Sequence, residues 1–581
     1  MIAWLNRLPL IAIWRQEFTG YSWAKLRRDL LAGVTVGAVG LPLALAFGVA
    51  SGADAAAGLV TAILAGIIIG GLGGASFQIS GPTGAMSAIL LVIAAQYGLG
   101  GVWAACVLAG IFLVLLGLFK LGRYVSFIPS PVISGFTSGI ALIIAVGQLD
   151  NVLGVQSPPA ENALAKLWHY LSSPPTPNWQ SLAVAGVVMA TMIGLPRLTK
   201  AVPASLVGLV LATLLAVIAG WNIPVIGTIP ATILLDNRLS LNNIPWDSLN
   251  NLIGPAISIA ALGAIESLLC GSVGAAMTGK QLDNNQELIG QGIGNMIIPF
   301  FGGVPATAAI ARTSVAIKSG AETRLTSIIH SLVLLLSALM LAPLLGRVPL
   351  AALGGVLLMT AWNMNEWHTI QFFAKTRLKH ALAGFFVTMI ATAALDLTQA
   401  ILIGIAISAV IYLRQSALST EVTNEAVSLE KLQAQGYQIT ETCPGIHVYY
   451  LTGPIFFGSV HTVLEALKSA TRFHTLVISM RGVPLVDAMG VQAVDQLIAE
   501  QRRRGGIICF TGLQPAVREM FARTGLLTTI GKPNIYWSAV EAIMSLHDER
   551  KMTGCAHCAS QGSICEVFAA AKERQAPASL A

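Results

Sequence analysis

The stretch GGASFQISGPTG, residues 73–84, interrupts a long apolar run with glycine, serine, proline and threonine. A second such stretch, FFGGVPAT at residues 300–307, lies far along the chain. We expect only about four turns of helix after each, so both helices would begin near the middle of a membrane. A helix N-terminus there leaves N–H groups unpaired and carries the positive end of the helix dipole, which suits an anion inside a protein cavity. The pair of interruptions therefore predicts two half-helices around an anion site.

The composition is that of a membrane protein. Hydrophobic residues make up 55% of the 581 residues and charged residues only 10%, against roughly a quarter charged in soluble domains. The formal net charge is +7, but the basic residues gather at alternate ends of successive apolar segments, so they indicate topology and not a nucleic-acid patch. We expect no cleavable signal peptide, a multi-pass protein of the inner membrane and both termini in the cytoplasm.

Fourteen membrane segments are expected, in two sets of seven. The first set is 30–50, 57–73, 83–96, 102–119, 130–148, 180–198 and 203–220. The second set is 252–272, 287–301, 307–318, 325–346, 350–363, 380–396 and 398–414. The short broken segment is third in each set, which indicates two repeats, and an odd number of crossings makes the repeats inverted with a site between them. The alternative is that glycine and proline merely kink ordinary membrane helices.

The composition also divides the chain into five parts. We expect an amphipathic segment on the membrane surface at residues 1–28, a polytopic α-helical transport domain at 29–415 and a linker at 416–435. Residues 436–548 alternate buried strands with helices and predict a cytoplasmic α/β domain. The last part, residues 549–581, is rich in alanine, serine and glycine and is expected to be flexible.

Four stretches resemble the SulP sulfate-permease family of anion transporters. Two of them are the broken helices, and the other two are LPLALAFGVASG at residues 41–52 and QELIGQGIGN at residues 286–295. The α/β domain is similar to the STAS domain that these transporters carry. The resemblance implies a core domain of segments one to four and eight to eleven, and a gate domain of the others. It also implies a homodimer, elevator-like movement of the core and a possible cytosolic partner for the STAS-like domain.

Glu266 is the most informative charge in the chain. It lies in the middle of the eighth apolar segment, where an uncompensated carboxylate costs several kcal/mol, so protonation or a cation partner is expected. A carboxylate near an anion site must be neutralised before the anion can approach, which is a physical basis for symport. In the family, the bicarbonate-transporting branch is typically sodium-coupled with an aspartate here, whereas many relatives with glutamate are thought to be proton-coupled. The alternative to a coupling role is that Glu266 is a structural residue that only forms hydrogen bonds.

Backbone N–H groups at the two half-helix starts are expected to contact the anion. Small side chains there let an anion approach the backbone, and the two threonines add hydroxyls. The expected contacts are Thr83, Gly84, Ala85, Met86, Ala306, Thr307, Ala308 and Ala309. Phe47 either forms a wall of the site or is simple helix packing. Arg312 adds positive potential, pairs with a carboxylate or lies at the core–gate interface.

Two features outside the transport domain give weaker signals. The turn Val486–Gly490 matches the place where anti-sigma antagonists carry a phosphorylatable serine, but Ala488 and Met489 have no hydroxyl, so a docking or assembly role is expected. Asp487 is predicted to cap the following helix. The tail carries cysteines at spacings that fit zinc only incompletely, so metal binding is the weaker alternative. These cysteines are Cys555, Cys558 and Cys565.

The sequence therefore predicts a secondary active transporter of bicarbonate, sulfate or a small dicarboxylate, coupled to protons through Glu266. The alternatives are a sodium-coupled bicarbonate symporter, an uncoupled anion exchanger or channel, and a scaffold in which transport is vestigial. An enzyme is not expected, because no nucleophile–base pair or complete metal cluster is recognisable. Beyond the coupling H⁺ or Na⁺, no cofactor is expected.

Overall fold

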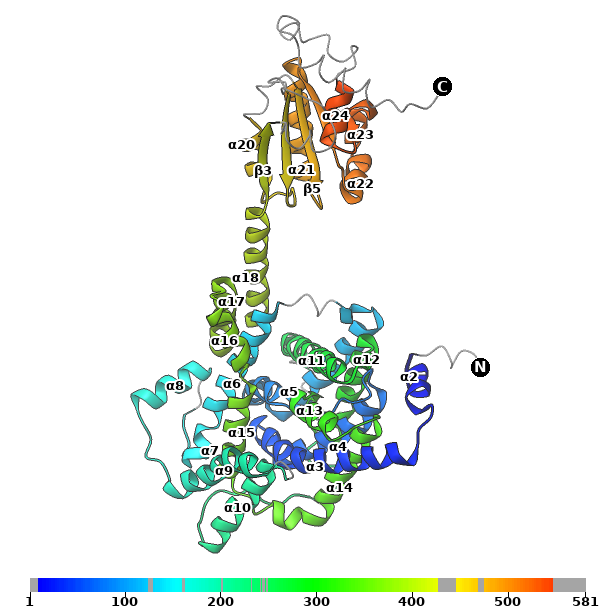
Figure 1. The fold of residues 1–581 in the computed structure, drawn as a ribbon. Helices are drawn as coiled ribbons and strands as arrows, with labels where there is room; N and C mark the ends of the chain where they lie inside the picture. Colours follow the sequence, from blue (N-terminus) through cyan, green and yellow to red (C-terminus); the bar gives the residue numbers. More distant parts are fainter. Residues whose placement is uncertain are drawn as a thin grey trace, which may run out of the picture. The chain divides into compact units, whose positions relative to one another are not determined.

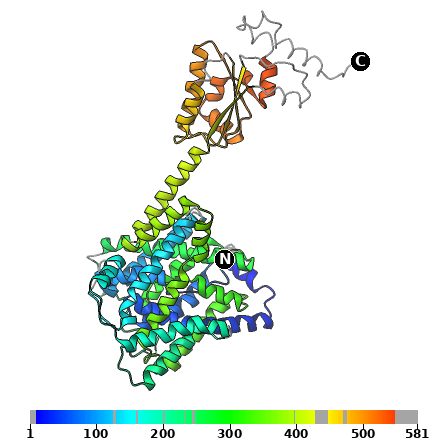
Figure 2. The ribbon, with the colours of Figure 1, turned by 60° about the vertical axis from the view of Figure 1, so that its left-hand side comes forward.

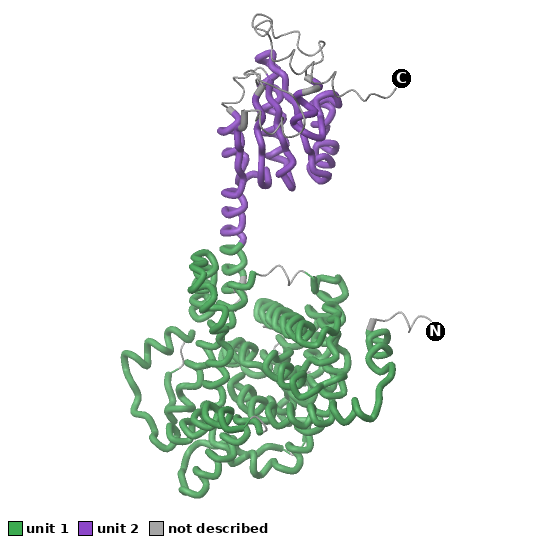
Figure 3. The backbone as a smooth tube through the Cα atoms, viewed as in Figure 1, with its two compact units in different colours: residues 1–408 green, residues 409–581 purple. Residues whose placement is uncertain are grey.

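A computed structural model gives the fold of the chain as two compact units, residues 1–408 and 409–581 (Figure 3). It describes residues 9–123, 129–158, 162–199, 202–230, 232–240, 242, 246, 249–395, 397–426, 446–468 and 475–546. The first unit is helical and the second is built on a β-sheet (Figures 1 and 2).

Helices account for nearly all of the first unit. Its first half contains α2 (Pro9–Phe18), α3 (Trp23–Ala50), α4 (Ala55–Leu72), β1 (Ser80–Gly81), α5 (Gly84–Leu118), α6 (Ser130–Gly147), α7 (Leu149–Leu153), α8 (Ala163–Ser172), α9 (Trp179–Leu198) and α10 (Ala204–Ile218). Its second half contains α11 (Leu249–Thr278), α12 (Asn284–Ile297), η3 (Ile298–Phe301), β2 (Thr307–Ala308), α13 (Ile310–Lys318), α14 (Leu325–Leu345), α15 (Leu350–Met364), α16 (Trp367–Lys375), α17 (Lys379–Ala394) and the first part of α18 (Leu397–Leu418), whose residues from 409 on belong to the second unit.

Each of the fourteen predicted segments corresponds to one of these helices or to part of one. In the described part of the chain, seven helices are long and apolar enough to cross a membrane, and α10 and α17 are shorter apolar helices. The third and fourth segments are two halves of α5, which bends at Gly98. The φ angle there is +66°, a value that glycine adopts without steric strain. The prediction of a polytopic helical membrane protein is confirmed.

The helices pack as the predicted core and gate domains. In the core domain, α5 packs against α11 and α12, and α14 packs against α3 and α4. In the gate domain, α6 packs against α15 and α17, and α9 packs against α10 and α15. The two domains meet where α3 contacts α10 and α15 and where α5 contacts α6.

The second broken helix begins later than its sequence indicates. The prediction placed its first residue at 307, but Thr307 and Ala308 form β2, and α13 begins at Ile310. The reason is a tertiary contact, because β2 pairs with β1, which lies in the first broken stretch. Arg312 is therefore the third residue of its helix.

The N-terminal segment is tied to the core domain by a buried ion pair. The first long helix, α3, already begins at Trp23, after Ser22 as its N-cap. Glu17, which precedes α3, forms an ion pair with Arg324 at 2.8 Å. The Arg324 and Glu17 side chains are only 1% and 4% exposed. The Arg324 guanidinium also donates to the Gly71 carbonyl at 2.6 Å. This ion pair therefore fixes α2 and the start of α14 to the end of α4.

The second unit has the strand–helix alternation that the sequence predicts for its α/β domain. Its strands are β3 (Glu421–Ala426), β4 (Ile446–Thr452), β5 (Thr475–Gly482), β6 (Ile507–Thr511) and β7 (Ile535–Tyr536). They form one sheet in that order, antiparallel between β3 and β4 and parallel thereafter. Its helices are α20 (Val460–Lys468), α21 (Ala488–Arg503), α22 (Pro515–Arg523), α23 (Leu526–Ile530), η5 (Lys532–Asn534) and α24 (Ala539–Leu546). Asp487 caps α21 by accepting from the Gly490 N–H at 2.8 Å, as predicted.

Replacing Arg324 with alanine should lower the free energy of unfolding by about 3–5 kcal/mol, because Glu17 would remain as a buried, unpaired carboxylate. The matched control is Arg28→Ala, since the pair between Arg28 and Glu322 is 63% and 28% exposed. That control should cost about 0–1 kcal/mol. Denaturation of the purified protein in detergent measures both, and equal effects would contradict the structural role of the buried pair.

Candidate functional site

The two broken stretches meet in the interior of the core domain. Strands β1 and β2 run antiparallel, with Ser80 opposite Ala308 and Gly81 opposite Thr307. All four residues are buried. The Ala309 N–H adds a bond to the Ile79 carbonyl at 3.0 Å. This short pairing brings the N-termini of α5 and α13 together, as the sequence predicted for a pair of half-helices.

Thr83 caps the first half-helix and also contacts the intramembrane acid. Its hydroxyl oxygen accepts from the Met86 N–H at 3.3 Å, so the Met86 N–H is used by the cap. The same hydroxyl donates to Glu266 Oε2 at 3.1 Å. The N–H groups of Gly84 and Ala85 precede the first intrahelical hydrogen bond and have no acceptor in their own helix. They are the backbone donors of this N-terminus that remain for a ligand.

The second half-helix offers fewer of the predicted contacts. The Ala306 N–H donates to Asn295 Oδ1 at 2.7 Å, and the Ala309 N–H donates to Ile79 as described above. The Thr307 hydroxyl lies 2.9 Å from the Ser267 hydroxyl. Ala308 lies in β2 with its side chain buried. Because α13 begins at Ile310, its free first-turn N–H groups lie about three residues beyond those that the sequence suggested.

Arg312 reaches from α13 to the other broken stretch. It is 1% exposed, and its Nη2 donates to the Pro82 carbonyl at 2.8 Å. Its Nη1 has no hydrogen-bond partner among the described residues. A side chain at Gly81 would put its Cβ 2.7 Å from Nη1, so glycine is needed for this approach. The guanidinium thus contacts the residue that precedes Thr83 and adds positive charge near the start of α5.

Gate-domain side chains cover the start of the first half-helix. A Cβ at Gly84 would lie 3.1 Å from Phe47 Cε1, 2.5 Å from Ile144 Cδ1 and 3.5 Å from Met364 Sδ. Phe47 belongs to α3 of the core domain, whereas Ile144 and Met364 belong to α6 and α15 of the gate domain. The start of α5 therefore lies at the core–gate interface with an apolar wall, and Phe47 is part of that wall. Glu266, from α11, is partly exposed here.

Three buried amides that the sequence did not single out hold the broken stretches in place. Asn295 binds Ala306 twice, through the N–H described above and by donating Nδ2 to the carbonyl at 2.8 Å. Gln78 donates to the Ser267 carbonyl at 3.0 Å, and Gln291 donates to the Ser80 hydroxyl at 3.1 Å. Gln291 and Asn295 lie in the motif at residues 286–295, so the motif was recognisable but the roles of its residues were not.

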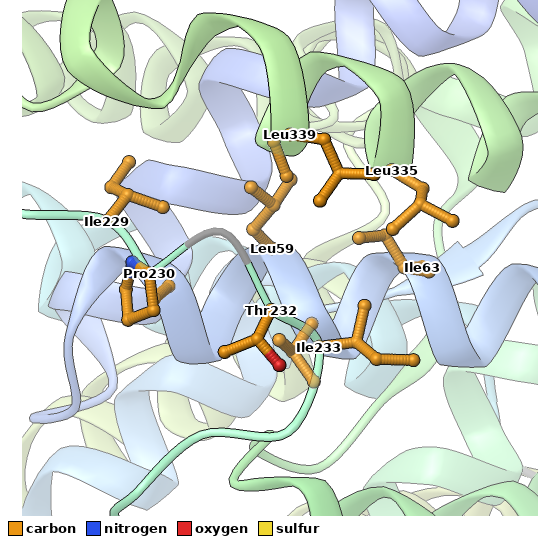
Figure 4. Close-up of a pocket in the computed structure, with 11 residues that line it drawn as sticks. Leu59, Ile63, Ile229, Pro230, Thr232, Ile233, Leu335 and Leu339 are labelled. Atoms are coloured by element: carbon orange, nitrogen blue, oxygen red, sulfur yellow. The ribbon is translucent and has the colours of Figure 1, made fainter.

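One small apolar cavity does not suit an anion, and no metal-binding cluster occurs among the described residues. A cavity of about 10 Å³ between α4, α14 and the segment around Ile229–Ile233 is lined by aliphatic side chains apart from Thr232 (Figure 4). Its lining offers no cation. Among the described residues there is no cluster of three or more His, Cys, Asp or Glu side chains that could hold a metal. The candidate ligands Cys555, Cys558 and Cys565 lie outside the described residues.

Comparison with known proteins fits this arrangement of helices and sheet. The profile of the Sulfate permease family matches residues 26–392, and that of the STAS domain matches residues 437–542. The chain belongs to the sulfate permease family. This family consists of transporters and not of enzymes.

Relatives in this family cover almost the whole chain. YvdB of Bacillus subtilis strain 168, which carries the name of a sulfate transporter, is 34% identical over 90% of this chain and 98% of its own length. The bicarbonate transporter BicA of Synechocystis is 30% identical over 89% of this chain and 94% of its own. The murine anion transporter Slc26a9 has the same fold, with a TM-score of 0.82 at 19% identity over 94% of each chain.

Removing the Asn295 side chain tests how the second broken stretch is held. Asn295→Ala should destabilise the protein by about 1–3 kcal/mol for each buried group of Ala306 left unpaired. Asn251→Ala is the control, because Asn251 is exposed near the start of α11. Thermal denaturation in detergent measures both, and a stability change no larger than that of the control would contradict the clamp.

Proposed function

We propose that this sulfate permease is a secondary active transporter that carries a small anion together with protons. The observation that carries the proposal is the 3.1 Å hydrogen bond between Thr83 and Glu266. Thr83 caps the half-helix whose N-terminus suits an anion, so the anion site and the acid share one side chain.

The anion would bind at the start of α5. Gly84 and Ala85 supply N–H groups without intrahelical acceptors, and the positive end of the helix dipole points to the same place. Arg312 adds a full positive charge from the side of Pro82. Ile144 and Phe47 lie against Gly84, so the anion would reach the Gly84 backbone when Ile144, on the gate domain, moves away from it. The N–H groups in the first turn of α13 would add to the positive electrostatic potential at the anion site.

Glu266 would couple the anion to a proton. While ionised, its carboxylate repels an anion at the neighbouring N-terminus and is itself poorly solvated among apolar helices. Protonation removes both penalties at once, so the anion and the proton favour each other's binding. Release of either one then favours release of the other, which is the linkage that symport requires.

A sodium-coupled site is the alternative that the same residues leave to experiment. The carboxylate of Glu266 and the hydroxyls of Thr83 and Thr307 are oxygen ligands of the kind that hard cations prefer. The names of the relatives support sulfate or bicarbonate as the anion, and a small dicarboxylate remains the third candidate. We place the protein in the inner membrane, as a homodimer with both termini cytoplasmic.

The site would cross the membrane by movement of the core domain against the gate domain. The anion site belongs to the core domain, while Ile144 and Met364 of the gate domain only cover it. An apolar cover without hydrogen bonds to Gly84 suits a sliding contact. The STAS domain would dock a cytosolic partner or support assembly.

Replacing Glu266 with glutamine should abolish accumulation driven by a proton gradient, because glutamine cannot take up or release the proton. Uptake of labelled sulfate, bicarbonate and fumarate into proteoliposomes, under separate proton and sodium gradients, measures this. Downhill exchange of the anion should persist in the variant. Glu322→Gln is the control, since Glu322 lies near the protein surface in an exposed ion pair.

Other outcomes of that experiment overturn parts of the proposal. Proton-driven accumulation by Glu266→Gln would refute the coupling role. Accumulation by the unaltered protein under a sodium gradient alone, at equal pH on both sides, would favour the sodium alternative. Ionic current proportional to voltage without accumulation would indicate a channel, and no flux of any of the three anions would refute transport of these substrates.

The double role of the Thr83 hydroxyl gives a second test. Thr83→Val keeps the shape of the side chain but removes both the cap and the bond to Glu266, so we expect uptake to fall by about tenfold or more, the equivalent of about 1.4 kcal/mol. Thr83→Ser retains the hydroxyl and should keep most of the uptake. Initial rates in proteoliposomes, normalised to the inserted protein, compare the two, and equal rates would contradict the role of the hydroxyl.

A further inference from the structure

A large cavity lies between the core and gate domains, beside the anion site but separate from it. It has a volume of about 730 Å³ and is lined by parts of α5, α6, α11, α17 and α18, with Asn162 and Ala163 at the start of α8. In α5 the lining begins at Ala88, one turn beyond Gly84. This volume is within the range of sites that hold small organic ligands. We refer to it as the core–gate cavity.

The core–gate cavity is polar at one end and apolar at the other. Gln96 and Tyr97 lie where the first half of α5 ends, and Asn251 lies near the start of α11. Deeper along the same helices the lining is Ile89 and Ile93 on α5, with Pro255 and Ile257 on α11. Beyond the amide and phenol groups at the mouth, the lining of both helices is mostly aliphatic. Ser258 and Thr392 also line this part, and their hydroxyls donate to carbonyls of their own helices, at Gly254 and Thr388.

The lining suits an amphiphile better than an anion. Among the described residues that line the cavity, none carries a charge. The cavity is also flanked by the outer surface of membrane-spanning helices, because Leu91 on α5 and Ile253 on α11 adjoin lining residues, do not line the cavity and are 43% and 44% exposed. Ile390, on α17, is 55% exposed as well. Such apolar surface on membrane helices faces lipid, so the cavity borders the bilayer.

We infer that the core–gate cavity binds an acyl chain of a membrane phospholipid, with the ester region of the lipid at the mouth beside Gln96, Tyr97 and Asn251. The chain would replace water along Ile89, Ile93 and Ile257, and the amides would hydrogen-bond the ester oxygens. The bound chain would lie between α5 and α11 of the core domain and α6 and α17 of the gate domain. Under the proposed elevator movement, it would resist sliding of one domain past the other.

Photolabelling tests the site without relying on transport. The protein is reconstituted in phosphatidylcholine that carries a diazirine on one acyl chain, irradiated and mapped by mass spectrometry. We expect label on Ile89 and Ile93, which are only 7% and 3% exposed and out of reach of lipid that merely surrounds the protein. Label confined to exposed side chains, with none on these two, would overturn the proposal.

Three variants, one of them with a thiol reagent, sharpen this test. Ala393→Phe fills the cavity from α17 and should abolish label on Ile89 and Ile93, whereas Ala95→Phe on the exposed side of α5 should leave it unchanged. Persistent label in correctly folded Ala393→Phe would count against the cavity as the site. Ile89→Cys should resist a membrane-impermeant thiol reagent, and rapid modification would show a water-filled vestibule and overturn the proposal. Neither readout depends on anion uptake, so failure here is distinguishable from failure of the transport proposal.

Discussion

The pairing of β1 with β2 is the constraint on which the transport domain depends. Irregular backbone at membrane depth is tolerable only where its N–H and C=O groups find partners inside the protein. Each broken stretch supplies those partners for the other, through the register of Ser80 with Ala308 and Gly81 with Thr307. Because one stretch comes from each repeat, neither repeat can satisfy its own backbone alone. The pairing therefore fixes both half-helix N-termini at one place.

Polar side chains of the core domain complete what the two-residue strands leave unpaired. The Thr313 hydroxyl accepts from the Ile79 N–H at 3.0 Å, and the Thr61 hydroxyl accepts from the Val304 N–H at 2.7 Å. Glu287 accepts from the Gly74 N–H at 2.9 Å. These side chains come from α13, α4 and α12, so the broken stretches are held by several helices at once. A site held on all sides in this way is preorganised for a ligand.

The sequence was sufficient for the architecture but not for the details of the site. Hydropathy and the two Gly/Pro interruptions predict the segments and their repeat, because those signals are local. The start of α13 was predicted too early, since nothing local reveals that Thr307 and Ala308 would be taken up by β2. The contact of Arg312 with Pro82 and the Asn295 clamp depend on residues far apart in the chain. Glu266 was recognisable because a lone carboxylate in an apolar segment is rare.

The two half-helices match in backbone but not in chemistry. The first has a hydroxyl cap shared with Glu266, a glycine covered by Phe47 and Ile144 and no charge of its own. The second has no side-chain cap, and instead sends Arg312 toward the first. The positive charge of the second repeat is thus used at the N-terminus of the first. Under the proposed function, an anion held there would contact backbone from one repeat, charge from the other and the acid of α11, so the inverted repeats would share one asymmetric site and not two equivalent ones.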